Sequence, residues 1–360
     1  MQRISIIFVL AAGLAFGQAV TIEEYEPRSP LVVPQHPVKV ARYPFIDVHN
    51  HQRGGTPEQV DRLVKDMDGL NMRIMVNLSG GYGDRFKQTV QALKGRYPDR
   101  FAVFANINFT GIDEPDYPKR AAAQFEEDVR NGAQGLKIFK NFGMDLKDGK
   151  GQRIHVDDPR FDLVFQTCAR LGLPVMIHTA EPKALFDPMD RFNERWLELK
   201  LYPGRGRPPE RYPSWEELIG EEHRLFARHP KTTFINAHMG WLGIDLARLG
   251  LLLDKQPNVH LDISAVLEEL GRQPRMAREF FIKYQDRAMF GKDTWRPVEY
   301  GTYFRTFETA DEYFDHDRKY HGMWKMYGLD LPDQVLRKLY YLNALRVVPG
   351  LKLPAVPGSD

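Results

Sequence analysis

Six side chains that could bind a metal ion or move a proton lie at the ends of short apolar segments. They are His49, His51, Lys137, His178, His238 and Asp293. Imidazole nitrogens with one carboxylate suit a borderline divalent ion such as zinc, and also manganese or iron. The single cysteine, Cys168, excludes an internal disulfide and a cysteine-based metal site. The residue types therefore predict a histidine-rich metal centre.

Eight short β-branched or apolar runs must position these side chains. The predicted strands are Phe45–His51, Arg73–Leu78, Phe101–Ile107, Gly135–Phe139, Pro174–His178, Thr233–His238, Val259–Ile263 and Ala288–Gly291. Helical patterns separate them, and a last helix runs from Pro332 to Arg346. This alternation predicts an α/β protein with a (β/α)8 TIM barrel, whose carboxyl strand ends converge on one face. Residues two apart in a strand share a face, so His49 and His51 should project together.

Several other classes are excluded or left as alternatives. A doubly wound sheet is the alternative to the barrel, but the sequence carries neither a dinucleotide-binding glycine motif nor a P-loop. Hydrophobic residues make up 42% and charged residues 27%, a balance typical of a folded enzyme rather than a disordered chain. The net charge is only +2, which argues against nucleic acid as a partner. The long connection from Glu181 to Pro213 is placed to cover the site, and its arginines, Arg195, Arg205 and Arg207, are expected at the surface.

The amino terminus predicts export. Arg3 precedes an apolar run that ends in small residues at Gly17 and Ala19, which is typical of a secretory signal peptide and too short for an ordinary membrane span. The predicted division is a signal peptide (1–19), an extended lead-in (20–43), the barrel (44–350) and a tail (351–360). A periplasmic or secreted location is expected, with no membrane span after cleavage.

The strand-end residues resemble those of a known superfamily. Asp47-Val48-His49-Asn50-His51, His178, His238 and Phe290-Gly291-Lys292-Asp293 are similar to the amidohydrolase superfamily. The branch is the amidohydrolase-related (amidohydrolase 2) group, which includes aminocarboxymuconate-semialdehyde decarboxylase, resorcylate decarboxylases, and lactone and pyrone hydrolases. The segment from Leu331 to Arg346 resembles the closing helix of that branch, so the resemblance covers about residues 44–350.

The resemblance implies a role for each residue. His49, His51, His178 and Asp293 would hold the metal, with one ion in each chain. His238 would orient the attacking water or polarise the substrate, and Asp293 would also relay the proton. Lys137 is ambiguous, because Gly135-Leu136-Lys137-Ile138 is also similar to the urease segment whose carbamylated lysine bridges two ions. We predict the one-metal reading, in which Lys137 contacts the substrate.

These implications give two candidate reactions on a small-molecule substrate. The first is hydrolysis of a lactone, amide or ester by metal-activated water. The alternative is metal-dependent, non-oxidative decarboxylation of an aromatic or enoic acid, which needs protonation at carbon and a cationic group to hold the carboxylate. The sequence leaves the substrate and a homodimeric assembly open.

Overall fold

The computed structural model describes residues 20–354. The chain divides into two compact units between Val32 and Val33. The described part of the first unit, residues 20–32, contains turns but no helix or strand. The predicted signal peptide and residues 355–360 of the predicted tail lie outside the described residues. No helix within residues 20–354 is long and apolar enough to cross a membrane.

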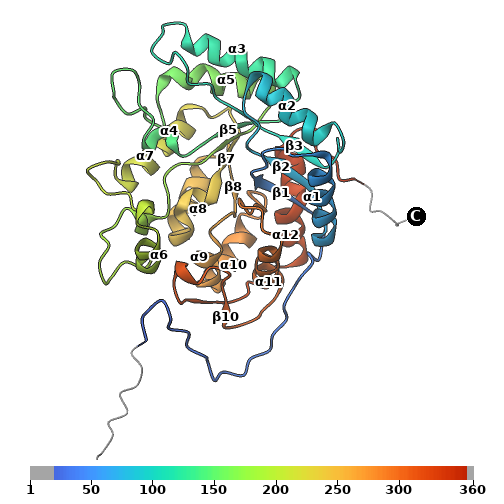
Figure 1. The fold of residues 1–360 in the computed structure, drawn as a ribbon, viewed down its shortest axis with the longest axis vertical. Helices are drawn as coiled ribbons and strands as arrows, with labels where there is room; N and C mark the ends of the chain where they lie inside the picture. Colours follow the sequence, from blue (N-terminus) through green and yellow to red (C-terminus); the bar gives the residue numbers. More distant parts are fainter. Residues whose placement is uncertain (1–19, 355–360) are drawn as a thin grey trace, which may run out of the picture. The chain divides into compact units, whose positions relative to one another are not determined.

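The strands of the second unit form a parallel barrel (Figure 1). They are β1 (Phe45–Asn50), β2 (Met72–Asn77), β3 (Phe101–Val103), β4 (Ala105–Asn106), β5 (Leu136–Ile138), β6 (Val175–Ile177), β7 (Phe234–Asn236), β8 (Val259–Asp262) and β9 (Ala288–Met289). Neighbours in the barrel are also neighbours in the sequence, and every pair is parallel. This order confirms the predicted TIM barrel, since a doubly wound sheet would reverse its strand order.

Two details close the barrel. The third predicted strand is divided into β3 and β4, where the Phe104 amide donates to the Asn77 carbonyl oxygen at 2.9 Å and the Ala105 amide donates to the Gly135 carbonyl oxygen at 2.9 Å. One stretch of chain therefore changes partner from β2 to the strand that follows. At the other seam, the Val48 amide donates to the Phe290 carbonyl oxygen at 2.9 Å, so β1 meets the end of β9.

The predicted helices alternate with these strands (Figure 1). They are α1 (Pro57–Leu70), α2 (Gly83–Lys94), α3 (Tyr117–Arg130), α5 (Asp162–Leu171), α7 (Trp215–Arg228), α8 (Leu246–Lys255), α10 (Pro274–Lys283), and the final stretch of α12 (Asp333–Arg337), a π-helical turn (Lys338–Leu342) and α13 (Asn343–Val347). In α1, Thr56 and Gln59 form a capping box, and the apolar side chains recur at helical spacing toward the barrel.

Further elements extend the loops and were not predicted. They are α4 (Asn141–Met144), α6 (Trp196–Leu201), α9 (Leu267–Gly271), α11 (Tyr300–Glu308), and the antiparallel pair β10 (Phe314–Asp315) and β11 (Lys325–Met326). All of them except α11 have six residues or fewer, and so short a segment shows no recognisable periodicity in the sequence.

The apolar core has two layers. The larger cluster lies between the strands and the surrounding helices. The smaller cluster includes Ile46, Val48 and Val76 from the strands, and it is completed by Ala344 and Val347 of α13. The carboxyl-terminal helix therefore contributes to the filling of the barrel, while the polar side chains of the strand ends are grouped separately.

Candidate metal centre

A β-bulge sets the direction of the first two histidines. Asp47 pairs with Met75 and Asn50 pairs with Asn77, so three steps along β1 match two steps along β2. The extra residue lies next to His49, and bulges of this kind re-aim side chains near functional sites. His51 follows β1 directly. Both imidazoles reach the same carboxylate, as the sequence predicts, but the bulge rather than simple alternation places them.

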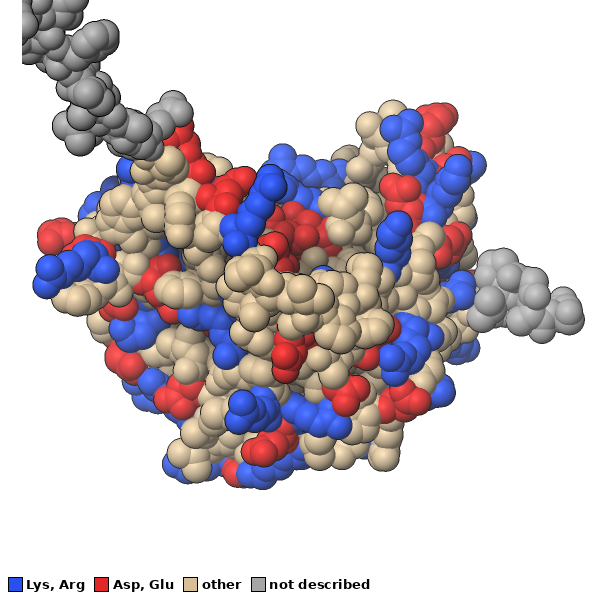
Figure 2. Space-filling model, turned by 90° about the horizontal axis from the view of Figure 1, so that it is seen from below, with Lys and Arg blue, Asp and Glu red and all other residues tan. Residues whose placement is uncertain are grey.

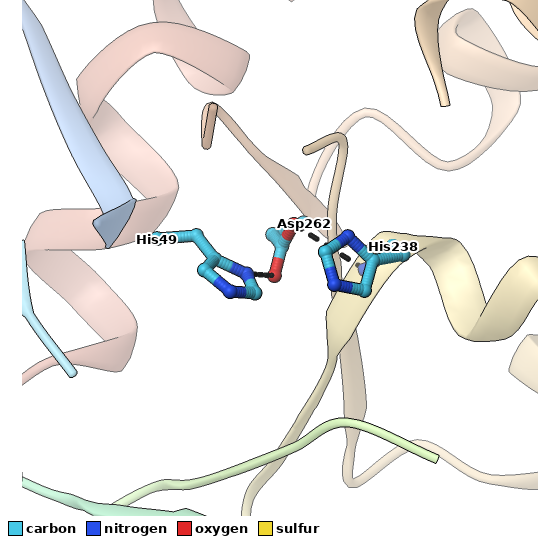
Figure 3. A group of neighbouring side chains, drawn as sticks. All are labelled: His49, His238 and Asp262. Carbon is cyan, nitrogen blue, oxygen red and sulfur yellow. Dashed lines mark hydrogen bonds and ion pairs between the residues drawn. The ribbon is translucent and has the colours of Figure 1, made fainter. Parts of the chain in front are cut away.

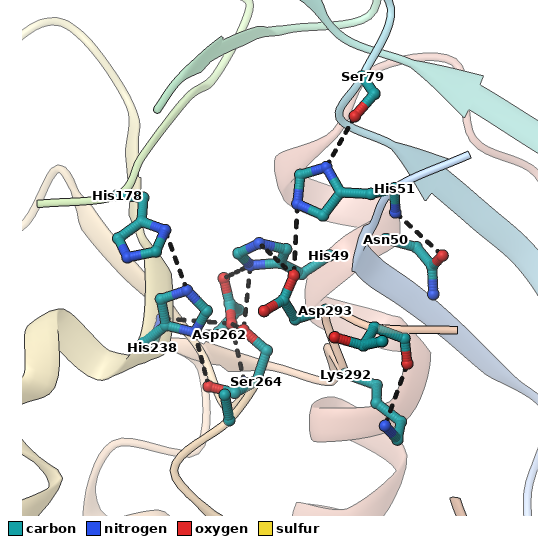
Figure 4. Close-up of polar contacts among 12 residues, drawn as sticks. His49, Asn50, His51, Ser79, His178, His238, Asp262, Ser264, Lys292 and Asp293 are labelled. Carbon is teal, nitrogen blue, oxygen red and sulfur yellow. Dashed lines mark hydrogen bonds and ion pairs between the residues drawn. The ribbon is translucent and has the colours of Figure 1, made fainter. Parts of the chain in front are cut away.

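His49, His51 and Asp293 form the candidate ligand cluster (Figure 4). Asp293 Oδ1 lies 3.4 Å from His51 Nε2 and 3.8 Å from His49 Nε2. One ligand atom from each of the three residues lies within 4.8 Å of the other two. His49 Nε2 is buried and has no hydrogen-bond partner in the described structure. A metal ion between the two side chains would accept the lone pair of His49 Nε2 and bind the Asp293 carboxylate. This cluster therefore fits a divalent ion.

The second nitrogen of each imidazole is held by a neighbour. Asp262 Oδ2 lies 2.9 Å from His49 Nδ1 (Figure 3), and Ser79 Oγ lies 2.8 Å from His51 Nδ1. A carboxylate can only accept, so the proton of a neutral His49 is on Nδ1 and its Nε2 lone pair is free. Such partners orient metal-binding histidines. Asp262 was not predicted. It is the last residue of β8 (Val259–Asp262), and its place near the carboxyl end of the predicted strand Val259–Ile263 is the one signal in the sequence that pointed to it.

His238 and His178 form a hydrogen-bonded pair beside the cluster. His238 Nδ1 donates to the Ser264 carbonyl oxygen at 2.8 Å, which leaves His238 Nε2 to accept from His178 Nδ1 at 3.2 Å. Because Nδ1 of His178 carries the proton in this series of hydrogen bonds, the lone pair of a neutral His178 lies on Nε2, which is buried without a partner in the described structure. His49, His238 and Asp262 form a second group of potential ligands, whereas His178 is in neither group that contains His49. Metal binding by His178 therefore stays a prediction.

A left-handed turn positions His238. The φ angles of His238, Met239, Gly240 and Trp241 are 57°, 53°, 60° and 54°. This conformation is unfavourable for residues other than glycine, and strain of this kind gathers at functional sites. At Gly240 a Cβ atom would come within 2.4 Å of Asn236 Nδ2. The turn stacks the Trp241 indole on the His238 ring, with 4.5 Å between centroids and 20° between planes.

Burial favours the neutral forms of His51 and His238. Desolvation, together with nearby His49 and Lys137, lowers the pKa of His51 to about 3. Desolvation likewise lowers the pKa of His238 to about 4. Burial opposes ionisation of Asp293, but the surrounding histidines more than offset it and the pKa of Asp293 is lowered. At neutral pH, His51 and His238 are therefore neutral imidazoles and Asp293 is a carboxylate, the protonation states that bind metal ions.

Lys137 places an amino group beside this centre. It lies in β5 with 1% of its surface exposed, and its Nζ has no hydrogen-bond partner among the described residues. Desolvation lowers its pKa to about 8, while Asp262 and Asp293 act in the opposite direction. The ammonium form therefore predominates at pH 7. The one-metal reading of this lysine stays a prediction.

The long connection is anchored by buried ion pairs. Arg195 is 3% exposed and pairs with Glu198 at 3.0 Å and with Glu268. The expected surface position of Arg195 is therefore wrong, because its carboxylate partners become neighbours only through the fold. Arg207 donates to Glu181 at 2.8 Å. These ion pairs hold the long connection in place. On the face seen in Figure 2, acidic and basic side chains are interspersed.

Several solved structures are similar to this one over most of its length. A 2,6-dihydroxybenzoate decarboxylase in complex with 2,6-dihydroxybenzoate has a TM-score of 0.53 and 16% identity, covering 85% of this chain and 99% of the other. A 5-carboxyvanillate decarboxylase of Novosphingobium aromaticivorans, in complex with manganese and 4-hydroxy-3-methoxy-5-nitrobenzoic acid, has a TM-score of 0.51 and 17% identity, covering 86% and 98%. A 4-oxalomesaconate hydratase of Rhodopseudomonas palustris has a TM-score of 0.52 and 14% identity, covering 85% and 95%.

At these identities the structural likeness establishes the fold. The sequence itself matches the amidohydrolase 2 family over residues 46–350, which is nearly the whole predicted barrel. The match includes His49, His51, His178, His238 and Asp293. The barrel and the histidine–aspartate cluster agree with that assignment, and the chain belongs to the amidohydrolase family of metal-dependent enzymes.

Proposed function

We propose that this protein is a metal-dependent, non-oxidative decarboxylase of a small aromatic or enoic acid. The observation that carries the proposal is the Lys137 amino group, whose Nζ is buried beside the ligand cluster without a hydrogen-bond partner among the described residues. Leaving a buried charged group unpaired costs about 1–3 kcal/mol or more. A substrate carboxylate would satisfy it, whereas a neutral lactone, amide or ester brings no charge to do so.

The similar structures support this reading over hydrolysis, which the sequence led us to expect first. Two of the three described above are decarboxylases, and the complexes contain a benzoic acid or a close analogue. The third is a hydratase, so the same fold also supports addition of water. Lys137 is the feature of this chain that favours decarboxylation, and measurement of carbon dioxide release distinguishes the two reactions.

His49, His51 and Asp293 would hold the metal, with His178 as the predicted fourth ligand. When bound, a divalent ion supplies Lewis-acid stabilisation to the substrate oxygens. Zinc, manganese and iron all suit imidazole and carboxylate ligands, and manganese is present in the carboxyvanillate decarboxylase complex. We expect one ion per chain.

The protein side chains then have separate tasks. Lys137 binds the carboxylate and orients the bond that breaks. As that bond breaks, carbon dioxide leaves, the electron pair stays on the substrate carbon, and a proton must reach that carbon. Asp293 has a lowered pKa and is ionised in the free site, so it must first take up a proton from solvent or from a substrate hydroxyl. It then delivers this proton to carbon as the general acid.

The test measures carbon dioxide release by metal-loaded protein from a panel of hydroxybenzoic and enoic acids, with lactones, amides and esters in parallel. Lys137→Met should lower kcat/KM for the acid by about 10- to 100-fold, the effect expected from losing a charged hydrogen bond. Lys94→Met is the control, because Lys94, the last residue of α2, is partly buried but donates to Gln134 at 2.7 Å. Hydrolysis of a neutral substrate without carbon dioxide release, unaffected by Lys137→Met, would contradict the proposal.

The export prediction is also a proposal for this protein. We expect the mature chain to begin near Gln18 or Val20. Amino-terminal sequencing of exported protein is the test, and a mature chain that still begins at Met1 would contradict it.

A further inference from the structure

A cavity of about 470 Å³ lies next to the histidine pair. Its walls come from the loops that follow β6, β7 and β8. The lining includes Lys183, Asp187, Phe192, Trp241, Ile244 and Glu269. Binding sites for small molecules commonly have volumes of about 300–1,000 Å³, so the space is enough for one substituted ring.

Trp241 is shared by the cavity and the metal centre. It lines the cavity, and its indole also stacks on His238 at 4.5 Å between ring centroids. The His178 ring centroid lies 5.8 Å from that of Trp241. A ligand in the cavity would therefore contact the residue that packs on His238. The strained backbone of residues 238–241 fixes both rings together.

Two residues that line the cavity, Trp241 and Glu269, each have a buried polar atom without a partner in the described structure. These atoms are the indole nitrogen of Trp241, which can only donate, and Oε2 of Glu269. Burial and the nearby Glu268 raise the pKa of Glu269, so this carboxyl group is disposed to remain protonated. A bound molecule with an acceptor oxygen would satisfy the indole donor, and a hydroxyl group would match the Glu269 oxygen.

The charges of the lining disfavour an anion. Among the described residues that line the cavity, Lys183 is the cation, and its ammonium already pairs with Asp187 at 2.8 Å. The lining also carries the acidic side chains of Asp187, Asp190 and Glu194, which repel an anion. Two apolar side chains are exposed among them: Phe192 is 78% exposed and Ile244 is 41% exposed. Arg191 lies over the Phe192 ring at 4.7 Å from the centroid, which leaves the opposite face for a ligand.

We propose that this cavity binds a neutral aromatic ring that bears hydroxyl or alkoxy oxygens, and that this ring is the part of the substrate remote from the carboxylate. The second half of the statement rests on the proposed function. The two sites divide the substrate by charge: Lys137 takes the carboxylate, and Trp241, Phe192 and Ile244 take the neutral end. The substrate class is therefore an aromatic acid extended by a second, neutral ring.

The first experiment measures binding without catalysis. Calorimetric titration of the full protein with 1,2-dimethoxybenzene should show one site. Phe192→Ala should weaken binding about tenfold, and Trp241→Phe should weaken it about three- to tenfold because the ring remains and the N–H donor is lost. Leu251→Ala is the matched control, since Leu251 is 61% exposed on α8, outside the cavity lining, and binding should not change. Equal affinities in wild type and Phe192→Ala would overturn the proposal.

The second experiment links the cavity to the substrate. Phe192→Ala should lower kcat/KM for a hydroxybenzoic acid that carries a neutral ring through an ether link about tenfold more than it lowers kcat/KM for the single-ring acid. An equal effect on both acids would overturn the assignment to the substrate. If 1,2-dimethoxybenzene binds as expected but no acid is decarboxylated, the proposed function fails while the cavity assignment stands.

Discussion

Replacing Asp262 by asparagine tests whether this carboxylate sets the metal-binding form of His49. Asp262 accepts a hydrogen bond from His49 Nδ1 at 2.9 Å and one from the Ser264 amide at 2.8 Å. The asparagine of Asp262→Asn has only one acceptor oxygen, and its NH2 group takes the place of the other oxygen. If this oxygen accepts from the Ser264 amide, the NH2 group faces His49 Nδ1, and that nitrogen must then accept a hydrogen bond. The proton of neutral His49 would then move to Nε2, and the lone pair facing Asp293 would be lost.

The size of this effect follows from the role of such partners. Loss of an outer carboxylate of this kind typically costs 10- to 100-fold in metal affinity, or about 1.4–2.7 kcal/mol. The assay is competition with a chromophoric chelator, followed by metal analysis after gel filtration. Asp128→Asn is the matched control, because Asp128 is a fully buried carboxyl group that accepts from the Gly83 amide and belongs to neither group of potential ligands that contains His49. An Asp262→Asn affinity within threefold of wild type would refute the reasoning.

The remaining predictions concern the proton, the fold's pH dependence and the metal. Asp293→Asn should lower turnover by about 10²- to 10⁴-fold, the usual range for a general acid, and turnover within a few-fold of wild type would exclude that role. Burial raises the pKa of Glu222 to about 7 from 4.5, so the folded state binds more protons between these values and the free energy of unfolding should fall by ~3 kcal/mol as pH rises through them. Glu222→Gln should remove this slope in denaturant titrations, and an unchanged slope would assign it to other groups. Chelation should abolish activity while circular dichroism retains the barrel signal, and His49→Ala should do the same; full activity in metal-free protein would contradict the metal centre.

The sequence was sufficient for the architecture because the barrel follows from repeated local patterns. Each strand is a short apolar run, and each of the major helices has a continuous apolar stripe, so both periodicities can be recognised without knowing the neighbours. The rule that parallel strands end on one face then groups residues far apart in the chain. This is why His49, His51 and Asp293 could be expected at one centre although more than 240 residues separate His51 from Asp293.

The sequence did not reveal the groups that act through another side chain. Asp262 carries no motif of its own, and it becomes a partner of His49 only because β8 and β1 lie in the same barrel. Arg195 has the composition of an exposed loop residue, yet three carboxylates from α6 and α9 surround it in the fold. Its burial depends on long-range pairing that local patterns do not encode.

Backbone geometry was likewise decided by tertiary structure. The bulge in β1 exists only as a mismatch with β2, so it has no signal within Phe45–Asn50 alone. The left-handed turn at residues 238–241 includes three residues other than glycine, which intrinsic preferences would not place there. Residue types at strand ends thus determined the kind of chemistry, whereas register, strain and packing between distant segments determined which atoms are free to carry it out.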